Sequence, residues 1–299
     1  MRALRFPAMQ STAPTHVLIT GATSGIGYEL AKLFAAAGKP LILVARLEDR
    51  LAAVAAELRA AHGVEVDVVA VDLFTPEGAQ EVIRRVQAAG RVVDVLVNNA
   101  GQGEWGLFVE TDLQRQLDII HLNVVVLVTL TRHFMAEMVA RDDGKILHLG
   151  SVFSKIPAPY MSVYAATKAF VLSFGEALIN ELKDTKVTTT VLMPGATDTD
   201  FFHKAGAVHT RVYGESPLSN PTDVARDGYD ALMSGKSSIV SGLRNKIQAT
   251  MADLLPLTVD AAIARSVNEP ITPGEHTRTE ATHEASRQER EALGGGRGE

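Results

Sequence analysis

The sequence predicts an α/β fold in which a single doubly wound domain surrounds a parallel sheet of about seven strands. Two observations lead to this prediction. Short segments rich in Val, Ile and Leu alternate with alanine-rich amphipathic segments from about residue 16 to residue 195. The apolar segments are nearly continuous, which is typical of parallel strands that are buried on both faces. Strands and helices that alternate in this way form right-handed βαβ units.

Each element follows from a local pattern. The segments with the length and composition of strands are His16–Thr20, Leu41–Ala45, Val66–Val71, Val93–Val97, Lys145–Gly150, Val187–Met193 and Ser237–Val240. Helical periodicity is expected at Glu29–Ala37, Glu48–His62, Val163–Lys183, Pro221–Ser234 and Leu243–Ala264. Gly38 and Gly90 follow helical patterns and are expected to end them.

The composition changes toward both ends of the chain. Residues 1–15 have no sustained apolar run, and a flexible leader is expected there. Residues 266–299 are rich in Glu, Arg, Thr and Gly and nearly lack large apolar side chains. Such a segment cannot bury enough apolar surface to offset its ordering entropy, so we expect a disordered tail with at most a weak helix near Glu280–Leu293. One domain is therefore predicted over residues 16–265.

Composition and charge exclude several classes of function. The 299 residues include no cysteine, which excludes disulfide frameworks and thiolate metal sites. The formal net charge of −6 argues against nucleic-acid binding, because no basic surplus exists to neutralise phosphates. No stretch approaches the roughly 18 apolar residues of a membrane-spanning helix, and Met1–Thr15 lacks the apolar core of a secretory signal. The expectation is a cytoplasmic protein without membrane contact.

A glycine-rich turn follows the first predicted strand. It reads Thr20-Gly21-Ala22-Thr23-Ser24-Gly25-Ile26-Gly27 and leads into a helical pattern. Glycines let the backbone approach a pyrophosphate closely, and the free N–H groups of a helix start favour the anion. The spacing is Gly-x-x-x-Gly-x-Gly, which differs from the common Gly-x-Gly-x-x-Gly fingerprint of dinucleotide sites. The alternative is a tight strand-to-helix turn without a ligand.

The second predicted strand ends in Val44-Ala45-Arg46. An acidic residue at this place binds the ribose 2′-hydroxyl of NAD, whereas an arginine accommodates the 2′-phosphate of NADP. Arg46 therefore favours NADP as the cofactor, and Arg50, one helical turn later, is placed to assist. The alternative is that both arginines belong to a solvated helix start.

Tyr164 and Lys168 are four residues apart in a long helical pattern, so they share one helix face. A free tyrosine has a pKa near 10, and a nearby cation favours its phenolate. Tyr164 is therefore a candidate acid for carbonyl reduction or base for alcohol oxidation. The pair alone is weak evidence, but Ser151 ends an apolar strand 13 residues upstream, at the strand end where ligands bind in such folds.

Together these motifs resemble those of the short-chain dehydrogenase/reductase family, in the family's order and spacing over roughly residues 15–240. The motifs are Thr20–Gly27, Asp72, Asn98-Asn99-Ala100-Gly101, Asn123, Ser151, Tyr164, Lys168 and Pro194-Gly195. The resemblance implies a Rossmann-type catalytic domain. Ser24 is a departure, because some NADP-specific relatives have a basic residue before the second glycine of the turn, so the preference for NADP rests on Arg46.

The resemblance also implies a role for each catalytic position. Tyr164 would protonate the carbonyl oxygen as hydride arrives from the nicotinamide, and Ser151 would hydrogen-bond that carbonyl. Lys168 would lower the pKa of the phenol and bind the nicotinamide ribose. Asn123 would hold a water in a proton relay toward Lys168. Donors that are already fixed in place stabilise a developing oxyanion best.

The remaining positions carried over by the resemblance are cofactor contacts. Asp72 and Leu73, after the third strand, would contact adenine. Asn98, with Asn99, Ala100 and Gly101, would form the floor of the cofactor site. Pro194, Gly195 and Thr199 would lie near the nicotinamide amide, and no metal is expected.

The function implied is hydride transfer between NADPH and a small carbonyl or alcohol substrate. Two alternatives stay open at this point: a 3-oxoacyl reductase acting on acyl chains, and a catalytically silent dinucleotide-binding regulator. The resemblance further implies a homodimer or homotetramer paired through the helices near Asp112–Ala140 and Val163–Lys183.

Other polar and aromatic residues have competing interpretations. Asp198, Asp200 and His203 resemble a metal cluster but are expected in a solvated loop. Trp105, Phe201 and Phe202 are either pocket walls or ordinary packing, Tyr160 is a candidate for the entrance, and His148 has no assigned role. The segment Leu243–Ala264 is expected to pack on the domain, with a cap over the pocket or contact with a membrane surface as alternatives.

Overall fold

Seven parallel strands form one sheet in the part of the chain that the computed structural model describes, residues 14–252 and 254–271. Their order across the sheet is β3-β2-β1-β4-β5-β6-β7. The strands are β1 (Thr15–Thr20), β2 (Leu41–Ala45), β3 (Val66–Ala70), β4 (Val92–Asn98), β5 (Gly144–Leu149), β6 (Val187–Met193) and β7 (Ser238–Val240). The predicted doubly wound α/β fold is therefore confirmed.

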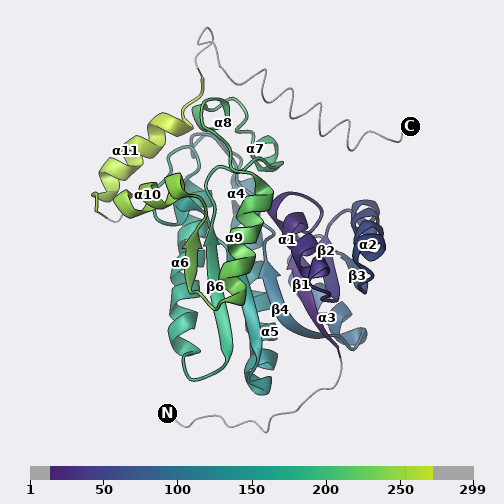
Figure 1. Ribbon diagram of the computed structural model, residues 1–299. Coiled ribbons are helices and arrows are strands. Elements are labelled where there is room, and N and C mark those ends of the chain that lie inside the picture. Colours follow the sequence, from purple (N-terminus) through teal and green to yellow (C-terminus); the bar gives the residue numbers. More distant parts are fainter. Residues whose placement is uncertain (1–13, 253, 272–299) are drawn as a thin grey trace.

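Helices cover both faces of this sheet (Figure 1). One face carries α1 (Gly25–Ala36), α2 (Glu48–His62) and α9 (Pro221–Met233), which share a core cluster. On the other face, α3 (Gly78–Ala88) packs against a long helix made of α4 (Leu113–Ile120), the π-helical segment η1 (His121–Val126) and α5 (Leu127–Arg141), beside α6 (Ser162–Glu181). Shorter elements are η2 (Val152–Ser154), α7 (Phe201–Lys204), α8 (Arg211–Gly214), α10 (Leu243–Ala252) and α11 (Leu257–Asn268).

The strand order reverses direction between β1 and β4, which lie side by side in the middle of the sheet. Chain connections leave these two strands toward opposite sides, so a crevice opens beyond their carboxyl ends. The glycine turn follows β1, and Asn98 ends β4. The topology thus places the predicted cofactor residues at the carboxyl ends of the strands, where ligands bind in such folds.

The C-terminal part differs from the sequence prediction. The predicted helix Leu243–Ala264 is two helices, because Pro256 has no N–H to donate and disfavours helical backbone at the residue before it. Helix α11 continues to Asn268, and Thr210 bridges to Pro270, so the packed domain extends past the predicted boundary at residue 265. Most of the predicted leader and tail, including Glu280–Leu293, lies outside the described residues.

Two helices, Leu113–Arg141 and Ser162–Glu181, are long and apolar enough to cross a membrane by length and composition. The expectation that no stretch approaches this length is therefore wrong. Both helices pack against the sheet through Leu130, Phe134 and Val171, whose side chains are fully buried. Burial against the sheet is thus a sufficient reason for apolar residues in these helices.

His148, which had no assigned role, lies inside the core on β5 and is fully buried. Burial lowers the pKa of its imidazole to about 3, so the ring is neutral at physiological pH. Its Nδ1 atom is 3.2 Å from the Asn98 amide nitrogen, which also donates to the Thr131 hydroxyl. His148 therefore belongs to a buried polar network beneath the ends of β4 and β5. Asn98 is part of that network and does not line the cavity described below, contrary to its predicted place in the cofactor floor.

Candidate active site

A cavity of about 330 Å³ opens at the carboxyl ends of the strands. It runs from the glycine turn after β1 to the segments that follow β5 and β6. The predicted site residues in its lining are Gly21, Thr23, Ser24, Gly25, Ile26, Asn99, Ala100, Gly101, Ser151, Tyr164, Lys168, Pro194, Gly195 and Thr199. Gly27, Arg46, Asp72, Leu73 and Asn123 were also predicted, and they lie outside this lining.

Ser151 is held in place by the short helix that it begins. Its hydroxyl accepts a hydrogen bond from the Phe153 N–H at 3.2 Å, and the Ser154 hydroxyl accepts one from the Ser151 N–H at 3.1 Å. This reciprocal capping satisfies two backbone donors and restricts the serine rotamer. The Ser151 side chain is also hydrogen-bonded to the Tyr164 phenol, so a strand end and a helix meet at the two hydroxyls.

Tyr164 lies in the first turn of α6 and faces the cavity. Desolvation by the surrounding protein raises the pKa of its phenol to about 12, and the hydrogen bond with Ser151 opposes that rise. Its ring is 5.0 Å from the Phe201 ring, centroid to centroid. A protonated phenol beside a second hydroxyl is an arrangement that can deliver a proton to a carbonyl oxygen.

Lys168 is one helical turn beyond Tyr164 and only 5% exposed. Its ammonium donates to the Leu149 carbonyl oxygen at 2.7 Å and lies 5.6 Å from the centroid of the Tyr164 ring. Burial lowers the pKa of the ammonium to about 8. The predicted lowering of the phenol pKa by Lys168 stays a prediction, because the opposing cause found at Tyr164 is the bond with Ser151.

Asn123 supports the site from the π-helical segment η1. Its side-chain oxygen accepts from the Gln102 N–H at 3.0 Å, and its amide nitrogen donates to the Gln102 carbonyl at 2.8 Å and to the Thr167 hydroxyl at 2.9 Å. The side chain therefore fixes the loop after β4 and the helix that carries Tyr164. π-Helical turns are frequent at functional sites. The water relay predicted for Asn123 stays a prediction.

The glycine turn has the shape of a phosphate cradle. Gly21 and Gly25 have φ angles of +68° and +57°, which L side chains rarely adopt. A Cβ atom on Gly27 would overlap the Asn99 amide and the Gly21 carbonyl oxygen. The Ser24 side chain makes no capping bond at the start of α1, so the first N–H groups of the helix stay available. These features fit the pyrophosphate of a dinucleotide.

Asn99 joins the glycine turn to the neighbouring strand. Its amide nitrogen donates to the Thr20 and Gly21 carbonyl oxygens at 2.8 and 3.1 Å. The Thr20 hydroxyl in turn accepts from the backbone N–H groups of Asn99 and Ala100, both at 3.0 Å. The Asn-Asn-Ala-Gly motif therefore fixes the shape of the turn.

The residues predicted to contact the 2′-phosphate and the adenine follow β2 and β3, which are one and two strands away from β1 in the sheet. Arg46 is exposed just after β2. Asp72 follows β3 and accepts the Phe74 N–H at 3.0 Å, while Leu73 is buried. All three follow the carboxyl ends of their strands, as the glycine turn does. They lie on the side of β1 away from β4.

The segment after β6 contacts both the glycine turn and the loop that carries Ser151. The Thr199 methyl lies against Gly25, where an added Cβ would be 2.8 Å away. The Asn245 amide lies so close to Gly195 that a Cβ there would overlap it. Pro194 accepts the Val152 N–H at 2.9 Å, which fixes this segment to the loop that carries Ser151.

Apolar and aromatic side chains form the wall beyond Tyr164. The lining there includes Val152, Phe153, Met161, Phe201, Phe202 and Val212. Phe201 and Phe202 are thus pocket walls, which decides between their two interpretations. Trp105 instead packs on Tyr160, with ring centroids 5.3 Å apart, and donates to the Asn268 carbonyl at 2.8 Å. Neither Trp105 nor Tyr160 is in the lining, and the place of Tyr160 at the entrance stays a prediction.

The acidic and histidine residues after β6 have ordinary partners. Asp200 pairs with Lys204 at 3.7 Å, and the His203 ring contacts the Tyr213 ring. In residues 14–252 and 254–271, the one group with metal-ligand spacing is instead His16, Glu65 and Asp67, far from the cavity. The Arg91 guanidinium binds both of its carboxylates.

The lining also contains residues that the sequence reading missed. Helix α10 contributes Arg244, Asn245 and Gln248, and α11 contributes Val267. These contacts support a cap over the cavity, and the buried cluster of Ile156, Ala252 and Ala264 shows that the segment also packs on the domain, as expected. No motif marks these positions, because their place depends on how α10 folds back from the edge strand β7.

Comparison with known proteins agrees with this geometry. Residues 15–209 match the family described as short chain dehydrogenase. The chain is 32% identical over 234 residues to dehydrogenase/reductase SDR family member 7B of Bos taurus, covering 75% of this chain and 72% of the relative. It is 35% identical over 184 residues to the very-long-chain 3-oxoacyl-CoA reductase of Mycosarcoma maydis, covering 60% of this chain and 53% of that protein.

A solved structure extends the likeness to three dimensions. The short-chain dehydrogenase from Sphingobium yanoikuyae in complex with NADPH has a TM-score of 0.70 and 29% identity, covering 88% of this chain and 99% of that one. In this chain the seven-stranded sheet brings the glycine turn and the cluster of Ser151, Tyr164 and Lys168 to one cavity. The chain belongs to the short-chain dehydrogenase family of oxidoreductases.

Proposed function

We propose that this protein transfers hydride between NADPH and a carbonyl or alcohol substrate, with Tyr164 as the general acid or base. The observation that carries the proposal is the meeting of the Ser151 and Tyr164 hydroxyls in a cavity that also contains the buried Lys168 ammonium. A carbonyl oxygen that reaches these hydroxyls gains two preorganised donors at the place where negative charge develops.

NADPH supplies the hydride when it is bound, and the protein supplies binding, orientation and the proton. The glycine turn and the start of α1 would hold the pyrophosphate. Tyr164 Oη would give its proton to the carbonyl oxygen, while Ser151 donates a hydrogen bond to the same oxygen. Lys168, held by the Leu149 carbonyl, would stabilise the phenolate that remains.

The direct test is consumption of NADPH and of NADH by the purified protein with ketones, aldehydes and 3-oxoacyl thioesters. We expect consumption with at least one class of carbonyl compound. Binding of NADPH without turnover of any class would support the alternative of a catalytically silent regulator.

A 3-oxoacyl reductase remains the second candidate. It is favoured by the likeness to the very-long-chain 3-oxoacyl-CoA reductase of Mycosarcoma maydis and by the apolar wall beside Tyr164. Faster turnover of 3-oxoacyl thioesters than of simple ketones in the same assay would select this candidate.

Arg46 is proposed as the residue that selects NADPH over NADH. The substitution Arg46→Asp removes a charge-assisted contact to the 2′-phosphate and adds repulsion, so we expect the ratio of kcat/KM for NADPH to that for NADH to fall by about 100-fold. Steady-state kinetics with both dinucleotides measures this ratio. The control Lys236→Asp makes the same charge change at the far side of the sheet and should leave the ratio unchanged. An unchanged ratio in Arg46→Asp would contradict the assignment.

We also propose that the protein assembles as a homodimer or homotetramer through the long helix of α4, η1 and α5 and through α6. Large exposed apolar side chains on these elements are Leu113, Leu117, Ile120, Val125 and Phe170, and contiguous apolar surface of this kind marks sites of protein association. Sedimentation velocity should show a dimer or tetramer. The substitution Leu113→Glu should shift the equilibrium between oligomer and monomer toward the monomer. Leu254→Glu, on a different surface, is the control. A monomeric unmodified protein would contradict this assembly.

A further inference from the structure

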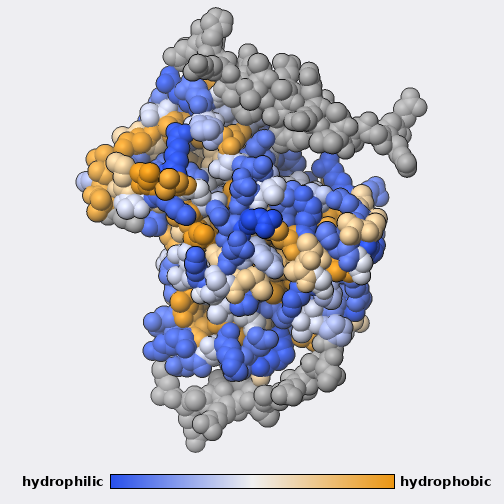
Figure 2. Space-filling model, viewed as in Figure 1, coloured by the Kyte–Doolittle hydropathy of each residue, from blue (hydrophilic) through white to orange (hydrophobic). Residues whose placement is uncertain are grey.

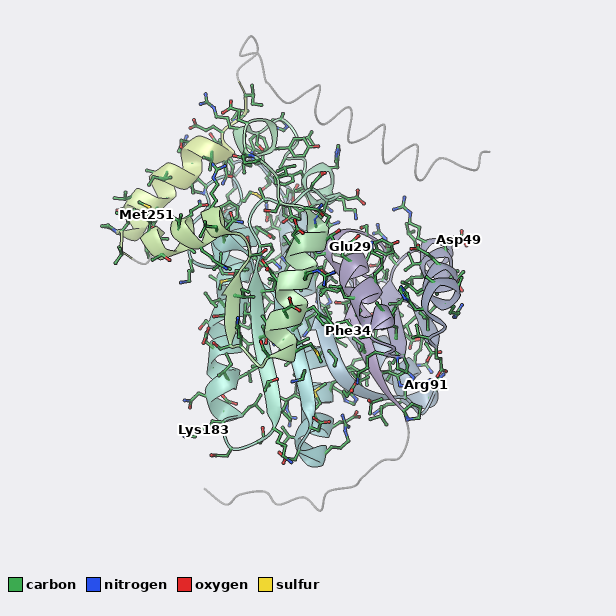
Figure 3. All side chains as sticks on the ribbon, viewed as in Figure 1. Glu29, Phe34, Asp49, Arg91, Lys183 and Met251 are labelled. Carbon is green, nitrogen blue, oxygen red and sulfur yellow. The ribbon has the colours of Figure 1, made fainter. Side chains whose placement is uncertain are left out.

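Helix α10 buries the small side chains of Ala249 and Ala252 and exposes large apolar side chains as well as polar ones. Leu243, Ile247 and Met251 are 75%, 55% and 55% exposed, and Figure 2 shows apolar surface over α10 and α11. Met251 is labelled on this outer part of the molecule in Figure 3. The polar side chains Arg244 and Gln248 instead line the cavity. Arg244 and Gln248 are themselves exposed, so they form a part of the cavity lining that is open to solvent.

The cavity lining contains three cationic side chains, of Lys168, Lys204 and Arg244, and the first two have partners. Lys168 donates to the Leu149 carbonyl and serves Tyr164, and Lys204 pairs with Asp200, the one carboxylate in the lining. Within residues 14–252 and 254–271, the Arg244 guanidinium has neither a hydrogen bond nor an ion pair. The protein as a whole has a net charge of −6 and nevertheless has an exposed, unpaired arginine in the lining of its active-site cavity.

The topology separates Arg244 from the phosphates of a dinucleotide. Arg244 follows β7 at one edge of the sheet, whereas the glycine turn follows β1, four strand positions away. At roughly 4.8 Å per strand this separation is about 19 Å. Arg46, proposed to bind the 2′-phosphate, is one strand farther. Arg244 instead precedes Asn245, whose amide lies against Gly195, beside the loop of Ser151.

We infer that Arg244 binds an anionic group of the substrate, and that the substrates are carbonyl compounds that carry a carboxylate, sulfonate or phosphate. This inference rests on the proposed function. A guanidinium offers two parallel N–H groups, which match the oxygens of such anions. The apolar wall of Phe153, Phe202 and Val212 accommodates the body of the molecule between that anion and the reacting carbonyl.

The test compares 4-formylbenzoate with methyl 4-formylbenzoate, which differ in one negative charge. For the unmodified protein with NADPH we expect a higher kcat/KM for the acid than for the ester. Arg244→Ala should lower kcat/KM for the acid by about 10- to 100-fold, mainly through KM, and change that for the ester less than about twofold. Arg244→Lys keeps the charge without the planar fork and should give an intermediate loss.

Two controls separate this inference from its alternatives. Lys246→Ala removes a charge from the same helix at an exposed position outside the cavity lining, and both substrates should be unaffected. The affinity for NADPH, measured by fluorescence titration, should be the same in Arg244→Ala. A weaker affinity for NADPH with an unchanged acid-to-ester ratio would assign Arg244 to the cofactor and overturn the inference.

A binding measurement keeps the two proposals distinguishable. Calorimetry of 4-formylbenzoate with the protein and NADP should show binding that Arg244→Ala weakens by the same factor as KM. If no carbonyl compound is turned over, the proposed function fails, while this binding still decides the role of Arg244. An equal affinity of both proteins for the acid would overturn the inference whatever the activity.

Discussion

Tyr164→Phe should lower kcat for carbonyl reduction by about 1,000-fold or more, because general acid catalysis contributes about 10²–10⁴-fold and the variant lacks the proposed acid. The two phenol-bearing candidates of this segment are Tyr160 and Tyr164, and of these Tyr164 alone lines the cavity. Removing one hydroxyl leaves the glycine turn intact, so we expect the affinity for NADPH to be largely retained. Single-turnover kinetics and fluorescence titration measure the two quantities.

Tyr160→Phe is the matched control for this prediction. Tyr160 lies four residues earlier, in the turn before α6, where it stacks on Trp105, and it is not in the cavity lining. We expect this variant to keep kcat within about twofold. Retained turnover in Tyr164→Phe would overturn the proposed mechanism, since the remaining Ser151 hydroxyl would then have to act as the acid.

Lys168→Met should also lower kcat by about 1,000-fold, and it should change the pH profile. The pKa of the buried ammonium is lowered to about 8, so the unmodified protein loses the positive charge beside Tyr164 as the pH rises through 8. Because the charge stabilises the phenolate left by proton transfer, carbonyl reduction should decline above about pH 8. Lys168→Met has no charge to lose, so its residual activity should lack this decline.

The fold should tolerate this substitution. Replacing a buried charge by an apolar side chain of similar length removes a desolvation penalty, so we expect no loss of thermal stability. Lys183→Met, at an exposed position just after α6 that Figure 3 labels, is the control and should keep both activity and pH profile. A decline above pH 8 that persists in Lys168→Met would show that another group titrates there.

Much of the fold was predictable because it depends on local patterns. The seven apolar segments became strands whose ends differ from the predicted ones by at most one residue, since parallel strands buried on both faces admit few polar residues. The exception is Leu243–Ala264, where α10 and α11 are separated at Pro256. The helical pattern continues across Pro256, but the backbone restriction of this proline separates the two helices.

The candidate site divides in the same way. By itself the sequence determined the residues whose spacing is set by one element or one turn: the glycines of residues 21–27, the Tyr164 and Lys168 pair, and Ser151 at a strand end. Tertiary structure alone decided that Asn99 rather than Asn98 faces the cavity, that His148 belongs to a buried network, and that Arg244 lines the site. These outcomes depend on contacts between segments far apart in the chain, and neither helical nor strand periodicity carries information about such contacts.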